Sequence, residues 1–378
     1  MDKKFVMGIA AMAALTLVSC SSDDLNSLSD NSSKNEAISF DSYLGRSAVA
    51  VNGSRGSMLN DKEALQGLEA GFGVFGNYSS TEYTEGTPAA YGNNLFDNQQ
   101  VTYKNSEWTY SPHKYWLPQG HIDFLAYAPY VKGTKLTGSS IDFTVENEVA
   151  KQKDLLYAKA ANQTMADNSG AKKVKFQFEH ALSRLGYSVK LKKDCSSDAT
   201  ITLKKIILAG SSTEPTGEPA TGSGAFYTKG AINLSTGNWT STSDKQYFKW
   251  YSAETTGAQS ITFTSSTPST PDKTYTNKDN EYLFVIPQNF SQTGNTLYVI
   301  VEYTIQYTGV KGSDGNPVIF TNKVYKQLTT DFKQGKAYTI NLTIGRPIEF
   351  DADVTEWSTT TDDNKKNDIN IDSWDVIK

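Results

Sequence analysis

Apolar and polar residues alternate over several stretches of this 378-residue chain, and that period of two constrains its fold more than any other feature. Alternation places every second side chain on one face of a β-strand, whereas an amphipathic helix needs a spacing near 3.6. Helical spacing is confined to short segments near 61–68 and 180–185. The alternating stretches are 141–145, 174–178, 185–191, 282–286, 297–307 and 338–344. We therefore expect an all-β protein built of antiparallel β-sandwiches.

Turn-forming residues separate the predicted strands, as in 210–217, 265–271 and 311–317. The polar stretch 161–173 is the best candidate for a linker between domains. The sequence thus predicts two tandem sandwich domains, an N-terminal one over 36–165 and a C-terminal one over 174–378.

The N-terminus has the pattern of a bacterial lipoprotein signal peptide. Lys3 and Lys4 precede an apolar run that ends in Leu17-Val18-Ser19-Cys20, which resembles a lipobox. We predict a signal peptide over 1–19, cleavage between Ser19 and Cys20, and lipidation of Cys20; the alternative is a secreted protein in which Cys20 is incidental. Residues 20–35 are polar and predict a flexible tether, and their first residues resemble the acidic tag of surface lipoproteins. The expected location is the cell surface, with the lipid in the outer membrane.

The composition excludes several classes of partner. The net charge of −5 and a pI near 5.4 argue against a nucleic-acid surface, because no basic block interleaved with aromatic residues is present. Beyond the signal peptide no apolar run is long enough to cross a membrane, so the lipid is the expected membrane attachment. With Cys20 acylated, Cys195 has no partner for an intramolecular disulfide.

No motif predicts catalysis, a cofactor or a metal. The segment 71–76 fits G-x-G-x-x-G, but no helical period follows it, so we interpret it as a strand. His113, His121 and His180 lack metal-ligand spacing, and Cys195 is interpreted as a loop cysteine. We expect no enzyme activity, no cofactor and no metal.

Two aromatic clusters, in 108–116 and 239–251, leave one rival function open. Exposed aromatic rings bind sugars by stacking, so a monomeric glycan-binding surface lipoprotein is the main alternative. Packing in the core is the competing interpretation, since aromatic residues are favoured on pleated surfaces.

An ordered set of segments resembles a known family. After the lipobox come Ile38-Ser-Phe40, an arginine, Phe72-Gly-Val-Phe75, and the segments 108–116, 122–130, 154–157 and 178–185. Together they resemble the fimbrillin family of Bacteroidales, the type V pilins that form major and minor fimbria. The resemblance implies two transthyretin-like β-sandwich domains in a fimbrial subunit that supports adhesion. It also implies partners that are other subunits, tip or anchor proteins, and an Arg-specific protease that removes the first strand before polymerisation. A shaft role and a tip role both stay open.

The strand to be removed is predicted near residues 37–45. Ile38, Phe40 and Leu44 point to one side of it, and nine residues at about 3.3 Å each reach about 30 Å, enough to fill a long groove. Arg46 follows this strand and is the favoured trimming site, with Arg55 as the alternative. An emptied groove would expose unpaired backbone groups and could accept a strand from a neighbour.

The candidate donor strand is the C-terminal segment Asp368–Lys378. Ile369 and Ile371 share one face, and Trp374 and Val376 follow after a slip in the alternation. The alternatives are a frayed tail and a strand that closes its own domain.

Overall fold

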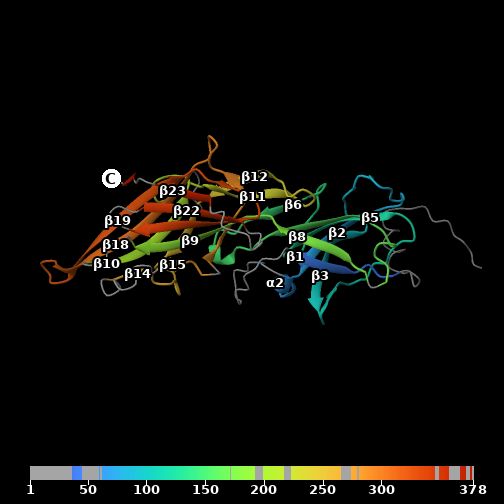
Figure 1. Cartoon of the computed structure of the whole chain (residues 1–378), viewed down its shortest axis with the longest axis horizontal. Coiled ribbons are helices and arrows are strands. Elements are labelled where there is room, and N and C mark those ends of the chain that lie inside the picture. The colour runs from blue at the N-terminus through green and yellow to red at the C-terminus, as the bar shows by residue number, and fades with distance from the viewer. Residues whose placement is uncertain are drawn as a thin grey trace, which may run out of the picture.

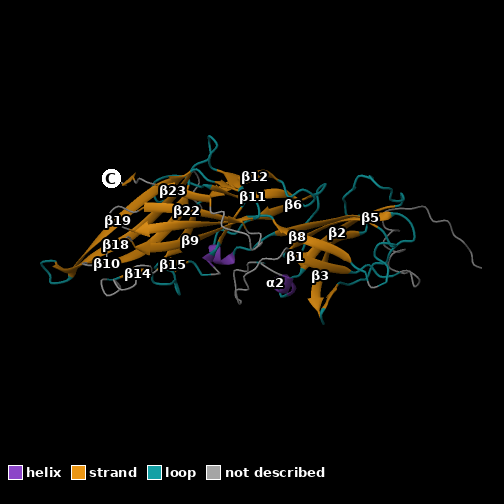
Figure 2. Ribbon diagram, viewed as in Figure 1, coloured by secondary structure: helices purple, strands orange, loops and turns teal. Residues whose placement is uncertain are grey.

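The computed structural model describes residues 36–44, 59, 62–170, 172–191, 199–216, 223–264, 274–278 and 281–344, and the strand backbone of 349–356, 367–371 and 375–376. The predicted all-β class is confirmed: Figure 2 shows strands joined by loops and turns, with very little helix. The described helical elements are one short α-helix and one 3-10 turn, α2 (Lys62–Gln66) and η1 (Val149–Lys151).

The N-terminal half forms a seven-stranded sheet, which we call the N-terminal sheet. Its strands follow the order β1-β8-β7-β5-β2-β3-β4. In that order they are β1 (Phe40–Leu44), β8 (Val174–His180), β7 (Leu156–Gln163), β5 (His121–Ala128), β2 (Phe72–Ser79), β3 (Phe96–Lys104) and β4 (Glu107–Thr109). The G-x-G-x-x-G segment forms β2, as predicted, and a side chain at Gly73 would collide with the Tyr127 ring of β5.

The remaining strands form what we call the C-terminal body. One six-stranded sheet contains β13 (Phe248–Ser252), β10 (Ala199–Ala209), β18 (Leu297–Lys311), β19 (Pro317–Leu328) and β24 (Asp375–Val376), with β14 (Thr262–Phe263) beside β10. The other contains β15 (Thr274–Thr276), β9 (Ser183–Leu191), β21 (Lys336–Ile344), β22 (Glu349–Glu356) and β23 (Asn367–Ile371), with β16 (Leu283–Val285) beside β9. Smaller sheets join β12 (Trp239–Gln246), β11 (Phe226–Asn233) and β6 (Ser140–Thr144), and pair β17 (Gln288–Asn289) with β20 (Asp331–Phe332).

The two parts follow one another along an elongated molecule, with the N-terminal sheet at one end and β18 and β19 reaching toward the other (Figure 1). Strand pairings cross the predicted boundary between 165 and 174 in two places. β8 lies inside the predicted second domain but pairs with β1 and β7, so the chain leaves the N-terminal sheet between His180 and Ser183. β6 lies inside the predicted first domain but pairs with β11. Alternation identifies a strand without identifying its partner, which explains both differences.

Two of the ladders between described strands are parallel, although antiparallel sheets were predicted. β1 runs parallel to β8, and β9 runs parallel to β21. Parallel neighbours need a long connection, and in each pair the two strands are separated by most of a domain's sequence.

Buried apolar side chains form two large clusters on opposite faces of the N-terminal sheet. One lies under β1 and includes Ile38, Phe40, Phe72 and Phe176. The other extends from Phe75, Leu125 and Tyr127 through the C-terminal body. Because both faces are covered, every residue of β5 is buried. Within the described chain, none of the helices has the length and apolar character needed to cross a membrane.

Candidate functional site: the N-terminal strand and its groove

The N-terminal strand lies in a groove at the edge of the N-terminal sheet. Residues 40–44 pair with 174–178 in parallel register, from Phe40 opposite Val174 to Leu44 opposite Phe178. On the opposite side, Ile38 donates its N–H to the carbonyl of Lys114 (2.8 Å), and Trp116 donates to the carbonyl of Glu36 (3.0 Å). The strand therefore has backbone partners on both sides over its first residues, and we call the space it occupies the β1 groove.

The predicted inward face of this strand is buried. Ile38, Phe40 and Leu44 are at most 4% exposed, and Ser42 between them is buried as well. Tyr43 points the other way and is 48% exposed. The alternation read from the sequence thus describes the strand's two faces correctly.

Phe40 is the centre of an aromatic cluster whose other members come from β2, β3, β5, β8 and the residue just after β4. Its ring centroid lies 5.5–6.5 Å from the rings of Phe72, Phe96, Tyr110, Phe124 and Phe176. Burying such an aromatic side chain stabilises the fold by about 1.5–3 kcal/mol, and aromatic contacts add to this. Sequence reasoning missed this cluster, because its members come from segments far apart in the chain.

A hydrogen bond also ties the strand to the opposite side of the groove. The Tyr110 hydroxyl donates to the carbonyl of Ile38 (2.8 Å) and accepts the N–H of Lys114 (3.2 Å). Ser39 accepts the N–H of Val174 (2.9 Å). Removing residues 36–44 would therefore leave the hydroxyl of Tyr110 and the N–H groups of Val174 and Trp116 without these partners.

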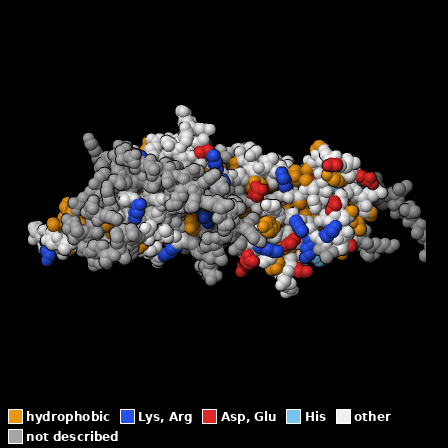
Figure 3. All heavy atoms as spheres, in the orientation of Figure 1, with side chains coloured by type: hydrophobic (Ala, Val, Ile, Leu, Met, Phe, Trp, Pro, Cys, Tyr) orange, Lys and Arg blue, Asp and Glu red, His pale blue; other side chains and the backbone are white. Residues whose placement is uncertain are grey.

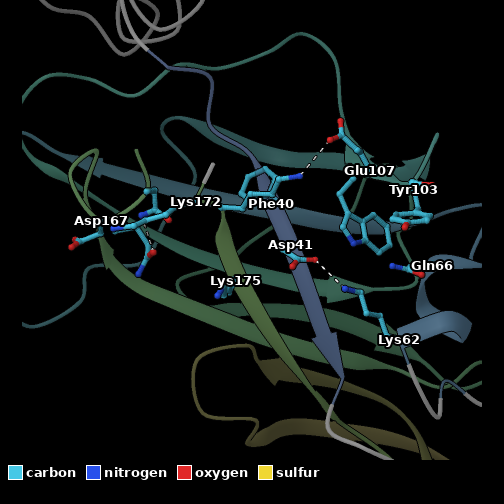
Figure 4. Close-up of a pocket in the computed structure, with 14 residues that line it drawn as sticks. Phe40, Asp41, Lys62, Gln66, Tyr103, Glu107, Asp167, Lys172 and Lys175 are labelled. Atoms are coloured by element: carbon cyan, nitrogen blue, oxygen red, sulfur yellow. Dashed lines mark hydrogen bonds and ion pairs between the residues drawn. The ribbon is translucent and has the colours of Figure 1, made fainter. Parts of the chain in front are cut away.

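A polar cavity of about 710 Å³ opens beside β1 (Figure 4). Asp41 of β1 faces Lys62 of α2 across it, with 3.6 Å between Oδ1 and Nζ, and Lys173 pairs with Glu107 at 3.8 Å. Basic and acidic side chains mix on this part of the surface in Figure 3. The lining residues with charged side chains are Asp41, Lys62, Glu107, Asp167, Lys172, Lys173 and Lys175.

The chain re-enters the described structure at Leu59, which is buried in the same core. Its N–H donates to Oδ2 of the fully buried Asp154 (3.3 Å), and that oxygen lies 2.9 Å from Nδ1 of His180. Arg46 and Arg55 both belong to the segment 45–58 between Leu44 and Leu59, and they lie outside the described residues. Both flanks of that segment are thus anchored in the core under β1.

The other predicted site residues fall in different places. Ser19, Cys20 and Trp374 lie outside the described residues. Ile369 and Ile371 belong to β23, which pairs with β22, and Val376 belongs to β24, which pairs with β19. The structure therefore places the candidate donor at two outer edges of its own C-terminal body.

The described part of the chain holds no cluster of three or more histidine, cysteine, aspartate or glutamate side chains that could bind a metal. Two of the histidines have buried carboxylate neighbours instead: besides His180, the Nε2 of His121 lies 3.8 Å from Oδ2 of Asp123.

The aromatic clusters that suggested glycan binding are mostly core. In the first cluster Trp108, Tyr110 and Trp116 are buried. In the second, Trp250 donates its indole N–H to the carbonyl of Glu281 (2.8 Å). The hydroxyl of Tyr251 donates to the backbone carbonyl of Gln259 (2.7 Å). Three rings of the second cluster border a cavity of about 660 Å³, yet each is at most 5% exposed: Tyr247, Trp250 and Tyr251. Stacking on a sugar would require these rings to leave the core.

Comparisons with known proteins agree on one family. Residues 66–362 match the model of a fimbrillin-like family. The chain is 25% identical over 400 residues to a fimbrium subunit, Fim1C, of Phocaeicola vulgatus, covering 96% of this chain and 98% of that protein. The crystal structure of a fimbrial protein from Bacteroides vulgatus has the same fold, with a TM-score of 0.61, 21% identity, and coverage of 85% of this chain and 100% of that one.

Proposed function

This chain belongs to the fimbrillin-like family, and from that premise we propose that it is a structural subunit of a cell-surface fimbrium, assembled by strand exchange and supporting adhesion. The observation that carries the proposal is the N-terminal strand, whose apolar face is buried in a groove that other strands complete. In the proposed mechanism a protease cuts after Arg46 or Arg55, and β1 then leaves the groove. A strand from a second subunit takes its place.

The position of the proposed cut supports this mechanism. Either arginine lies between Leu44 and Leu59, so one cut separates β1 from the rest of the chain. The new N-terminal segment would still be held at Leu59, which is buried and hydrogen-bonded to Asp154. The trimmed subunit therefore keeps its fold outside the groove, while β1 is retained by non-covalent contacts alone.

The emptied groove has the properties of a strand acceptor. It exposes the edge of β8, the backbone at 114–116 and an aromatic pocket shaped around Phe40. An unpaired edge beside an apolar groove is a template for β-strand addition. The donor in this proposal is the C-terminal segment Asp368–Lys378 of another subunit. Each subunit in the proposal consists of two transthyretin-like domains.

Lipidation at Cys20 accounts in this proposal for delivery to the outer membrane. Cys20→Ala should abolish labelling by palmitate and prevent the chain from reaching the outer membrane, whereas Cys195→Ala should leave both unchanged. Normal labelling of the Cys20→Ala chain would contradict the lipoprotein assignment.

The trimming step is tested by N-terminal sequencing of the surface form and by SDS-resistant ladders from sheared cells. The wild type should begin after Arg46 or Arg55 and form ladders. Arg46→Lys and Arg55→Lys keep the charge but remove the site of an Arg-specific protease, so the single variants identify the arginine that is cut.

The double Arg→Lys variant should begin at Cys20 and form no ladders. Ladders from that variant would show that trimming is not required. A single species beginning at Cys20 in the wild type, without ladders, would overturn the polymer proposal and favour a monomeric surface protein.

A further inference from the structure

The polar cavity beside β1 has one wall that its own hydrogen bonds hold in place. This wall is the segment 164–170, which follows β7. Asn168 is buried there, and its side-chain amide donates to Oε1 of Gln163 (3.2 Å) and to the carbonyl of Thr164 (3.1 Å). The hydroxyl of Thr164 donates to Oδ2 of Asp167 (2.6 Å). A wall that is ordered in advance lowers the entropic cost of binding a ligand.

A buried hydrogen-bond donor without an acceptor belongs to the other side of the cavity, where Figure 4 shows Tyr103 and Glu107. Trp108 of β4 lines the cavity and is 6% exposed, and its indole Nε1 has no hydrogen-bond partner in the described chain. The ring is fixed by Tyr103 and Phe72, whose centroids lie 5.1 and 4.7 Å away. A buried N–H that stays unpaired is costly, and the oxygen of a ligand would satisfy it.

Four lysines line the cavity, and their ammonium groups are only loosely paired. A carboxylate oxygen lies 3.6 Å from the ammonium of Lys62 and another lies 3.8 Å from that of Lys173, and both distances exceed a normal hydrogen bond. Lys172 and Lys175 make no ion pair with any residue that the structure describes. Figure 4 shows these two on the side of the cavity away from Glu107. The cavity therefore has positive charge available for an anionic ligand.

The uncharged part of the lining favours a ligand that is rich in hydroxyl groups. Amide and hydroxyl side chains donate and accept hydrogen bonds, as sugar hydroxyls do, and ammonium groups suit a carboxylate. The volume of about 710 Å³ is in the range of small-molecule sites. The rings of Phe40 and Trp108 are buried, so polar contacts rather than stacking would hold the ligand. The amide and hydroxyl side chains are those of Gln66, Ser106, Gln163 and Asn168.

From these observations we propose that the cavity binds an acidic saccharide, with its carboxylate on the side of Lys172 and Lys175 and a hydroxyl oxygen accepting the N–H of Trp108. This inference rests on the proposed role in adhesion and adds the chemical class of the ligand. Of the residues that line the cavity, only Phe40 and Asp41 belong to β1. A trimmed subunit thus keeps the other walls and all four lysines.

Calorimetric titration of the purified, untrimmed chain tests the class of ligand. Sialyllactose and a hyaluronan tetrasaccharide carry the carboxylate on different sugars, and lactose is the neutral control. At least one acidic probe should bind saturably, less tightly in high salt, and lactose should not bind. The probe that binds identifies the kind of acidic sugar. Failure of both acidic probes, or equal binding of lactose or of inorganic phosphate, would overturn the proposal.

Lysine substitutions locate the site. Lys172→Gln with Lys175→Gln should weaken binding of the acidic probe about tenfold, because two charged contacts are lost. Lys132→Gln with Lys135→Gln removes the same charge from exposed lysines outside the lining and should leave the affinity unchanged. All four side chains are exposed, so both double variants should fold. Equal losses in the two would show a general effect of charge and would overturn the site.

Two further variants act on single groups of the cavity, in opposite directions. Asp41→Asn removes a carboxylate but keeps an oxygen that can accept the N–H of Ser42 (2.9 Å), so the affinity should rise about twofold to threefold. Trp108→Phe removes the indole N–H and should lower the affinity about tenfold, with the urea midpoint recorded to show that the variant is folded. Weaker binding by Asp41→Asn, or unchanged binding by a folded Trp108→Phe chain, would overturn the proposed contacts.

The outcomes separate this inference from the polymer proposal. The titrations use untrimmed monomers, whereas the ladders from sheared cells report assembly. Loss of saccharide binding with normal ladders would leave the polymer proposal standing. Saccharide binding by a chain that forms no ladders would overturn the polymer proposal and leave the cavity assigned.

Discussion

The two ends of the described chain are both edge strands, but they are held in different ways. β1 is fixed by an apolar face that enters the core, by parallel pairing with β8 and by bonds to residues 114–116. β23 and β24 each follow one neighbouring strand, and β24 contributes only the pairs Val376–Val324 and Asp375–Tyr325. An edge strand that enters the core leaves a shaped vacancy when it is removed, whereas one added to an outer ladder leaves an open edge.

This contrast assigns different roles to the two ends in the proposed exchange. The N-terminal end supplies the acceptor, because its departure exposes a specific pocket and specific unpaired groups. The C-terminal end suits the donor, because each of its two strands pairs with a single neighbour at the edge of a sheet. Substitutions in β1 and its contacts test whether the inward face of the strand is what holds it in the groove.

The largest effect is expected from Phe40→Ala in the untrimmed chain. Truncating a fully buried phenylalanine lowers the free energy of unfolding by about 3–5 kcal/mol, and here five neighbouring rings would border the resulting cavity. Urea denaturation, followed by intrinsic fluorescence, measures the change.

Tyr43→Ala is the matched control on the same strand. Tyr43 is about half exposed and points away from the core, so the free energy of unfolding should change by no more than about 0.5 kcal/mol. Equal losses in the two variants would show that β1 is not held by its inward face.

An intermediate effect is expected from Tyr110→Phe, which keeps the ring beside Phe40 and removes the hydroxyl. The carbonyl of Ile38 and the N–H of Lys114 would each lose a buried partner, which costs about 1–3 kcal/mol. Phe40→Tyr is not a suitable control because it adds a buried hydroxyl. Tyr103→Phe removes a hydroxyl from the same region, at a partly exposed ring, and should have little effect on the urea midpoint.

The smallest effect is expected from ion pairs that join strands of the C-terminal body. Glu214 contacts Lys205 of β10 (2.9 Å) and Lys323 of β19 (2.6 Å), and Glu302 of β18 lies near both lysines. Burial alone would raise the pKa of Glu214, but the hydrogen bonds from Lys323 and Lys205 outweigh it and lower the pKa below the ordinary 4.5. Its stabilising contribution is therefore present above pH 4.5 and is lost as the pH falls through the lower folded-state value.

Glu214→Gln should reduce the free energy of unfolding by about 1 kcal/mol at neutral pH, and the difference from wild type should vanish well below pH 4.5. Urea titrations at the two pH values measure this. A loss as large as that of Phe40→Ala, or one independent of pH, would contradict the contrast between a strand held by its core face and strands supported by surface charges.

The sequence by itself determined the local features of this protein. Alternation identified the strands at 174–178, 185–191, 297–307 and 338–344, and it placed Ile38, Phe40 and Leu44 on the buried face of the first strand. These features could be predicted because the side-chain period of a strand is local and survives whatever the strand packs against. The order of motifs along the chain likewise identified the family that the comparisons show.

The tertiary structure alone decided which strands meet. Alternation could not reveal that β8 pairs with β1 across the predicted boundary, that β6 joins β11, or that the pairing of β1 is parallel. Alternation also could not predict the aromatic cluster around Phe40, because that cluster depends on contacts between distant segments. Its other members are Phe72, Phe96, Tyr110, Phe124 and Phe176. Each strand presents the same backbone groups to any neighbour, so its partner is fixed by the packing of the whole core, and the groove exists only once that core has formed.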